Sequence, residues 1–309
     1  MPTSSPTTKT ATKSTYGLAY GAAAVLFWSS GALLFCQLTA IPLLQYIAIS
    51  QIVGGFTCIL LTGGSLGPVA LCRRLTSNWI SVFLIGTNQL AFATAMRTAP
   101  PIHADLIIYL WPAMLVIGSA RRLNHAILPQ HILGMGLGFL GIFVFLAPEI
   151  FNHKIHSAYF SGYLCAFIAA LSWTTYSLRG TSATSEGKHA YIGKDVLIIG
   201  IVCAALHTIQ GEWVALTLYE WIIITTLGIV VYGLAVPCWQ KGLQLGRYTT
   251  VASLANVIPV LSVTWLIVGG VAPMTMTVAV AGLLISMSCW ILQSAPVSPL
   301  KQTASAHYT

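Results

Sequence analysis

Charged residues are scarce in this sequence. Only 6% of its 309 residues are Asp, Glu, Lys or Arg, and only six of those are acidic. A soluble domain carries about a quarter charged residues. Here 56% of the residues are hydrophobic and the mean hydropathy is +0.82. This composition excludes an ordinary soluble protein and predicts an integral membrane protein.

Familiar catalytic and metal-binding motifs are also missing. The sequence contains no Walker A, HExxH or GxSxG motif, and its seven cysteines are scattered without a CxxC pair. The stretch Gly136–Gly141 matches GxGxxG, but it lies inside an apolar segment with no strand before it, where small residues let helices approach closely. The sequence therefore predicts a protein that is not an enzyme and uses no cofactor or metal.

Long apolar segments fill most of the chain. Ten can be distinguished, and each is long enough for a helix that crosses a bilayer. Together they predict an all-α protein with ten transmembrane helices. The segments are 16–37, 41–63, 78–97, 102–120, 129–148, 158–180, 192–210, 218–240, 249–269 and 273–292.

The basic residues predict the orientation of these helices. If the N-terminus is cytoplasmic and the segments alternate, only Arg97 and Lys154 of the 14 lysines and arginines fall outside. Both termini are then cytoplasmic. Because the net charge of +8 is spread singly or in pairs between apolar segments, it indicates membrane topology and not a nucleic-acid-binding face.

The two halves of the chain resemble each other. AAVLFWSSGALL around Trp28 resembles AALSWTTYSL around Trp173, and YLWPAMLVIGS around Pro112 resembles NVIPVLSVTWL around Pro259, at nearly equal offsets. Five helices per half is an odd number, so the second half enters the membrane from the opposite side, as in the inverted repeats of secondary transporters. The predicted parts are a disordered N-terminus (1–14), two five-helix repeats (15–149 and 150–292) and a disordered tail (293–309).

The segment IHADLIIYLWPAMLVIGSARR combines several unusual features. Pro112 removes a backbone hydrogen bond near its middle and is expected to bend or open the helix. We interpret Pro112 and its repeat partner Pro259 as hinges or site-shaping residues.

Several aromatic side chains are expected near the middle of the membrane, at the depth of Pro112 and Pro259. Trp28, Tyr109, Trp111 and Trp173 all fall near the middle of their segments, and Tyr176 follows one turn after Trp173. They could line a pocket for a planar substrate, although ordinary helix packing is the alternative.

The remaining candidates for substrate binding or coupling are three amide side chains, one acid and a histidine. Asn88, Gln89 and Asn256 could hold the substrate's polar groups or only tie helices together. Asp105 is the one carboxylate placed well inside a predicted span, so we consider it, with the neighbouring His103, for substrate binding or proton coupling. The alternative is an acid at the outer rim, favoured by the helix dipole and paired with Arg97.

The chain resembles the drug/metabolite transporter superfamily, of the EamA type. The residues that carry this resemblance are the ten apolar segments in two halves, each with a proline in its fourth helix. His103-Ala104-Asp105, the motif Tyr109-Leu110-Trp111-Pro112, and Trp173 with Tyr176 are similar to the aromatic amino acid exporters of the YddG type. The resemblance implies a secondary transporter of the bacterial inner membrane that exports aromatic or other neutral amino acids by alternating access. Its substrate would bind in a central cavity between the repeats.

Other functions remain open at this point. The exported solute could be a nucleoside, a sugar derivative or a cationic toxin. An intramembrane enzyme would need a clustered nucleophile, base or metal set, which the sequence does not offer, and a non-transporting scaffold would make the mid-depth aromatic residues replaceable. The expected partners are the lipid bilayer and a small-molecule substrate, with no nucleic acid, and a monomer is one of the open oligomeric states.

Overall fold

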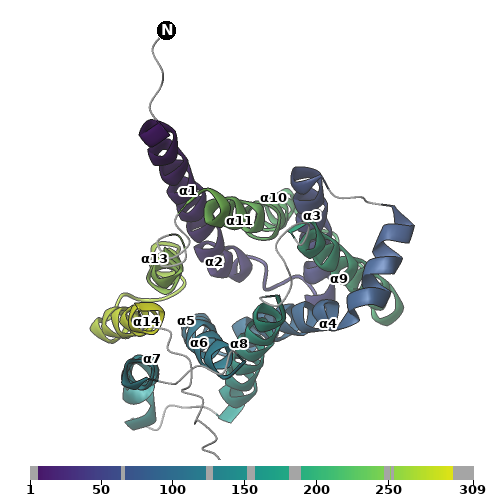
Figure 1. The fold of residues 1–309 in the computed structure, drawn as a ribbon. Helices are drawn as coiled ribbons and strands as arrows, with labels where there is room; N and C mark the ends of the chain where they lie inside the picture. The colour runs from purple at the N-terminus through teal and green to yellow at the C-terminus, as the bar shows by residue number, and fades with distance from the viewer. Residues whose placement is uncertain are drawn as a thin grey trace, which may run out of the picture.

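The computed structural model describes residues 6–63, 67–122, 128–151, 157–180, 189–246, 251 and 254–294. Within these ranges every regular element is a helix (Figure 1). The chain therefore has the predicted all-α architecture in all the parts that are described.

The helices follow the chain as a series of spans, several of them interrupted. Those before residue 160 are α1 (Pro6–Ser29), α2 (Gly31–Cys36), α3 (Leu43–Thr62), α4 (Pro68–Thr98), α5 (Pro101–Ile108), α6 (Trp111–Arg122), α7 (Pro129–Phe151) and η1 (Ser157–Tyr159). The later ones are α8 (Phe160–Gly180), α9 (His189–Gln210), α10 (Leu218–Leu227), η2 (Gly228–Leu234), α11 (Ala235–Leu245), η3 (Leu254–Val257), α13 (Ile258–Val268) and α14 (Met276–Ser294).

The apolar segments of the sequence coincide with these helices. Five spans among the described residues are long and apolar enough to cross a membrane, judged by length and composition: 15–36, 43–62, 68–98, 192–210 and 218–242. Shorter apolar helices cover 101–115, 129–144, 258–268 and 276–288. The full count of ten crossings stays a prediction. Helix α1 reaches back to Pro6, into the stretch for which the sequence predicted disorder, and residues 295–309 of the predicted tail lie outside the described residues.

Local chemistry explains where several helices begin and end. Pro68 and Pro101 stand in the first turns of α4 and α5, where a missing N–H costs no hydrogen bond. Thr217 and Glu220 form a reciprocal capping box at the start of α10. Helix α3 ends at Gly63, whose φ of 71° lies in the left-handed region that glycine adopts readily.

Several spans are interrupted without leaving the bundle. Between α1 and α2, the hydroxyls of Ser29 and Ser30 donate to the carbonyls of Leu26 and Phe27, a back-bonding that bends helices. Helix α4 has a non-helical residue at Asn78. The helix that contains Pro237 opens into the π-helix η2 one turn earlier.

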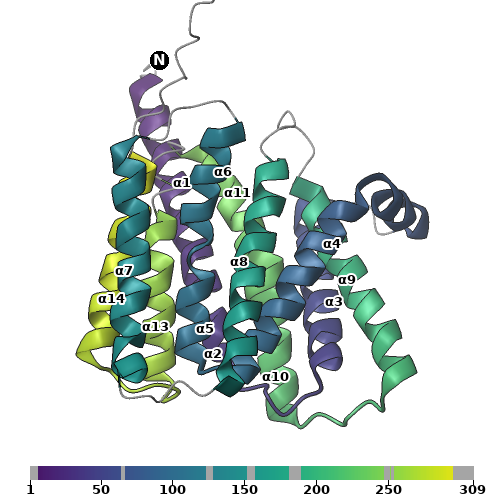
Figure 2. The same ribbon diagram turned by 90° about the horizontal axis from the view of Figure 1, so that it is seen from below.

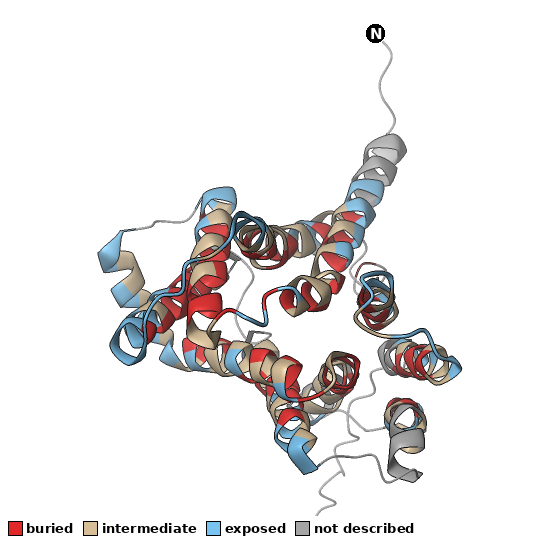
Figure 3. Ribbon diagram, turned by 180° about the vertical axis from the view of Figure 1, so that it is seen from behind, coloured by how far each residue is buried: buried red, intermediate tan, exposed pale blue. Residues whose placement is uncertain are grey.

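The spans pack in four main pairs: α3 with α9, α7 with α14, α4 with α8, and α1 with α11. Short helices α2 and α5 lie toward the centre of the ring that these pairs form (Figure 1). Buried residues lie on the faces that meet neighbouring helices, and exposed ones lie toward the periphery (Figure 3).

The two ends of the bundle differ. Following the predicted topology, we call the end with the start of α1 the inner end and the opposite end the outer end. Helices α6 and α11 approach the inner end, whereas α2, α5 and α10 lie toward the outer end (Figure 2).

Candidate functional site

One aromatic group joins α6 to α8. The rings of Trp111 and Trp173 are 6.4 Å apart between centroids in an edge-to-face arrangement. Trp173 continues to Tyr176 with centroids 5.6 Å apart. All three side chains are only partly buried. We call these residues the aromatic wall.

A second aromatic group joins α1 to α11. Trp28 and Trp239 have centroids 5.5 Å apart. These two residues and Tyr109 pack on a small buried cluster of Val25, Ala255 and Ile258. The sequence singled out Trp28 and Tyr109 but missed Trp239, because Trp239 has no counterpart in the repeat comparison.

The two proline-containing segments are broken as the sequence predicted. Helix α5 ends at Ile108 and α6 starts at Trp111, so the break falls at Tyr109 and Leu110, just before Pro112. The other segment has a 3-10 turn up to Val257, and α13 begins immediately before Pro259. The ring of Pro112 and the side chain of Asn256 lie outside the described residues, so the role predicted for Asn256 stays a prediction.

Asp105 is buried at the meeting point of α5 and α13. Its side chain is 2% exposed, and the Ser262 hydroxyl donates a 2.6 Å hydrogen bond to its Oδ2. The acid is thus enclosed in the bundle and does not lie at the outer rim. The pairing with Arg97 that the sequence left open is not formed, because Arg97 donates instead to the carbonyl oxygens of Ile41 and Leu38.

His103 faces a different neighbour. Its Nδ1 lies 2.8 Å from the Tyr163 hydroxyl on α8, and the two rings stack with centroids 5.9 Å apart. The structure therefore directs the hydrogen bonds of His103 and Asp105 to different helices, α8 and α13.

The predicted polar residues of α4 have partners in neighbouring helices. Asn88 Nδ2 donates to the Ala169 carbonyl at 2.9 Å, which ties α4 to α8. Gln89 Oε1 accepts from the Tyr232 hydroxyl at 3.1 Å, and that hydroxyl lies 3.4 Å from the hydroxyl of Tyr46. Asn88 and Gln89 remain partly exposed.

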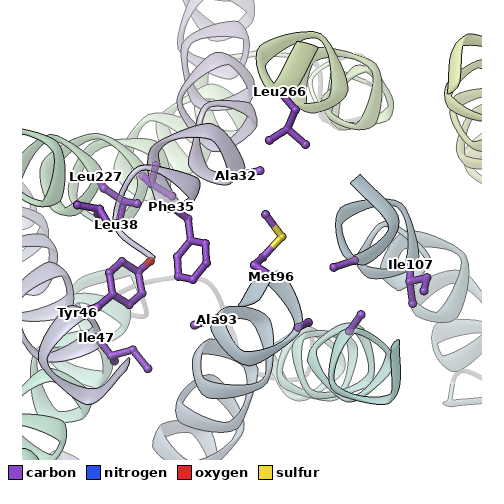
Figure 4. Close-up of a cluster of buried hydrophobic side chains, with 14 of the residues drawn as sticks. Ala32, Phe35, Leu38, Tyr46, Ile47, Ala93, Met96, Ile107, Leu227 and Leu266 are labelled. Atoms are coloured by element: carbon purple, nitrogen blue, oxygen red, sulfur yellow. The ribbon is translucent and has the colours of Figure 1, made fainter. Parts of the chain in front are cut away.

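Apolar side chains from three helices are buried together toward the outer end of the bundle. Phe35 of α2, Met96 of α4 and Leu266 of α13 are each at most 2% exposed and belong to one buried cluster. Figure 4 shows Met96 between Phe35 and Leu266. We call these three residues the outer plug. A further bond from Trp265 Nε1 to Ser29 Oγ, at 3.2 Å, ties α13 to the interruption after α1.

A second carboxylate of the chain is also buried, which the sequence did not indicate. Asp195 of α9 is fully buried and pairs with Arg74 of α4 through two hydrogen bonds, of 2.6 Å from Nε and 2.5 Å from Nη2. The position of Asp195 near a segment end hid its burial from sequence reasoning. Its partner Arg74 comes from α4, which packs against α9.

The side chains gathered between the helices define the chemistry that the candidate site offers. Among the described residues, no group of three or more His, Cys, Asp and Glu side chains is placed to hold a metal ion. The centre instead offers partly exposed aromatic rings, two amides and one enclosed carboxyl.

The fold and the residues between its helices define the class of protein, which is a helical membrane protein with aromatic side chains in its interior. The chain is similar to the aromatic amino acid exporter YddG of Ancylobacter novellus, with 28% identity over 267 residues that cover 86% of this chain and 92% of the relative. A solved crystal structure shares the fold with a TM-score of 0.66 and 25% identity, covering 90% of this chain and 96% of that one. No family model matches the sequence.

Proposed function

We propose that this protein is a secondary transporter that exports aromatic or other neutral amino acids across the bacterial inner membrane. It works by alternating access, with the substrate held at the centre of ten transmembrane helices. The observation that carries the proposal is the aromatic wall at the break of a proline-interrupted span. The similarity to an aromatic amino acid exporter over most of both chains supports the same substrate class.

The packing pairs support an inverted repeat. Exchanging the halves relates segment 16–37 to 158–180 and segment 78–97 to 218–240. Under this exchange the α1–α11 pair corresponds to the α8–α4 pair, and both are main contacts of the bundle. The α3–α9 and α7–α14 pairs each correspond to themselves. The two spans broken before Pro112 and Pro259 are then equivalent hinges between halves.

In the proposed cycle the structure corresponds to a state closed to the outside. The outer plug is buried, whereas the side chains of the aromatic wall keep accessible surface. A substrate from the cytoplasm would place its ring against Trp111 and Trp173. Gln89 and Asn88, on the facing helix α4, would approach its polar groups. Outward release then requires α2, α5 and α13 to separate around the plug.

Counterflow in proteoliposomes tests the substrate class. Vesicles loaded with unlabelled tryptophan should take up labelled tryptophan, and phenylalanine and tyrosine should compete. The variants Trp111→Ala and Trp173→Ala should each slow exchange by about two- to tenfold, since an aromatic contact contributes about 0.5–1.5 kcal/mol.

Trp290→Ala is the matched control, because that tryptophan on α14 is 60% exposed. Competition by nucleosides, sugar derivatives or cationic toxins, but not by aromatic amino acids, would move the assignment to another exporter of small amphipathic solutes. Unchanged exchange in both wall variants would favour a scaffold.

A further inference from the structure

We propose that a polar cluster between α3, α4 and η2 binds the ammonium and carboxylate groups of the exported amino acid. The cluster consists of Tyr46 and Gln51 of α3, Gln89 of α4 and Tyr232 of η2. The inference rests on the proposed export function and adds the residues that recognise the polar end of the substrate. We call these four residues the polar cluster.

Gln51 is a buried amide without a hydrogen-bond partner. Its side chain is 0% exposed, and neither its amide oxygen nor its amide nitrogen is bonded to any of the described residues. Tyr232 lies close enough to interact with this amide electrostatically, but without hydrogen-bond geometry. A buried polar group that gives up water and gains no partner costs free energy. Such an amide calls for an explanation, and a bound solute that completes its hydrogen bonds supplies one.

The other members extend the cluster toward the centre of the bundle. The Tyr232 hydroxyl donates a 3.1 Å bond to Gln89 Oε1 and lies 3.4 Å from the Tyr46 hydroxyl. Tyr46 is 1% exposed, whereas Tyr232 and Gln89 keep accessible surface. Tyr232 and Gln89 are therefore the members that a solute reaches first, and the amide of Gln51 lies deeper.

Close backbone packing fixes the position of Tyr232 against α3. A Cβ built on Gly54, one turn after Gln51, would lie 2.4 Å from the Cβ of Tyr232. A Cβ built on Gly228 would lie 2.8 Å from the carbonyl oxygen of Ser50. Only glycine at these two positions permits so close an approach of η2 to α3. The segment η2 is a π-helix, a local structure that occurs frequently at functional sites.

The cluster offers both kinds of group that a zwitterion needs. The amide nitrogen of Gln51 and the tyrosine hydroxyls can donate to a carboxylate, and the amide oxygens of Gln51 and Gln89 can accept from an ammonium. In the structure the Tyr232 hydroxyl and Gln89 Oε1 satisfy each other. A substrate that enters between them replaces this bond with two. Tyr232 then donates to the carboxylate, and Gln89 accepts from the ammonium.

A neighbouring charge orients the two ends of the substrate. The Arg97 guanidinium lies 5.6 Å from the centroid of the Phe35 ring, and Phe35 meets Tyr46 edge to face with centroids 4.9 Å apart (Figure 4). The buried Nε of Arg97 has no hydrogen-bond partner among the described residues. Its positive charge favours the carboxylate on the side of Tyr46 and the ammonium on the side of Gln89. The four members of the cluster are themselves uncharged at neutral pH, which suits a group with no net charge.

Competition by substrate analogues tests this recognition, using purified full-length protein in liposomes and counterflow of labelled tryptophan. The competitors are tryptophan, tryptamine, which lacks the carboxylate, and indole-3-propionate, which lacks the ammonium. For the wild type, half-inhibition by either analogue should need at least about tenfold more competitor than half-inhibition by tryptophan, because each analogue loses hydrogen bonds of a charged group. Gln51→Met and Tyr232→Phe each remove a donor to the carboxylate. Each should lower the ratio of tryptamine to tryptophan at least about threefold.

Thermal unfolding in the absence of tryptophan separates a binding amide from a structural one. Methionine is unbranched and similar in length to glutamine, so Gln51→Met removes the amide without leaving a large cavity. Because the amide has no partner to lose, this variant should unfold at or above the temperature of the wild type. Marked destabilisation would show that the amide ties helices together and would overturn the proposal. Gln210→Met is the matched control at an exposed position of α9, and it should change neither the ratio nor the unfolding temperature.

The ratio also decides between the remaining outcomes. An unchanged ratio in either variant, whatever its exchange rate, would mean that water or packing occupies the cluster, and it would overturn the proposal. Wild-type protein that binds both analogues as well as tryptophan would overturn the recognition of the polar end and leave the export function standing. Absence of wild-type counterflow would instead overturn the export function itself. For a variant that does not exchange, displacement of bound labelled tryptophan by the two analogues gives the same ratio.

Discussion

The ion pair between Arg74 and Asp195 makes a strong prediction about stability. Their side chains are 12% and 0% exposed, and the guanidinium meets both carboxylate oxygens. Asp195→Asn would remove the charge of the carboxylate that accepts both bonds from the guanidinium, and Arg74→Gln would leave the Asp195 carboxylate buried without that guanidinium. Removing one member of a buried pair costs about 3–5 kcal/mol, so each variant should lower the free energy of unfolding by roughly that amount.

The double variant Arg74→Gln/Asp195→Asn distinguishes a charge effect from a simple loss of packing. It leaves no uncompensated charge, so its destabilisation should be smaller than the sum of the two single effects by about 2 kcal/mol or more. Unfolding of the purified protein in mixed detergent micelles, followed by tryptophan fluorescence, measures all three. Glu212→Gln, at an exposed site, should stay within about 0.5 kcal/mol of the wild type.

Additive single effects would refute the reasoning, because they would mean that the two charges do not stabilise each other. Single effects below about 1 kcal/mol would do so as well, since they would place the pair in the range of solvent-exposed ion pairs.

Two further predictions concern packing and closure. A Cβ built on Gly55 lies 2.6 Å from the backbone nitrogen of Leu197. Gly55→Ala should therefore destabilise the α3–α9 contact by about 1–3 kcal/mol in the same unfolding assay. Gly136→Ala is the control and should not destabilise the protein, because a Cβ built there meets no atom within 4 Å. The side chain of Met96 is 2% exposed and that of Ile209 is 81% exposed. In a variant without native cysteines, Met96→Cys should therefore react with an impermeant maleimide added outside at least about tenfold more slowly than Ile209→Cys. Equal labelling rates would show that the outer plug does not close.

Much of the architecture could be predicted from the sequence because its causes are local. Apolar segments become helices in any arrangement that buries them, and their hydropathy is visible residue by residue. The break before Pro112 was also predictable, since a proline removes the same hydrogen bond wherever the helix packs. For the same reason, the break of the helix before Pro259 was predictable.

The partners of the polar residues could not be predicted in this way. Ser262 lies 157 residues from Asp105, and its selection depends on how α5 and α13 are rotated against each other. The sequence suggested His103 or Arg97 as neighbours, because both are close along the chain. His103 points instead to α8, and Arg97 reaches the carbonyls after α2.

The sequence by itself therefore determined that this is a helical membrane protein with proline-broken spans. Composition and periodicity carry that information without reference to other parts of the chain. Only the tertiary structure decided that Asp105 is enclosed beside the outer plug, that Asp195 is buried against Arg74, and that Trp239 joins Trp28. These facts depend on which faces of distant helices meet, and helix rotation leaves no signature in a single sequence.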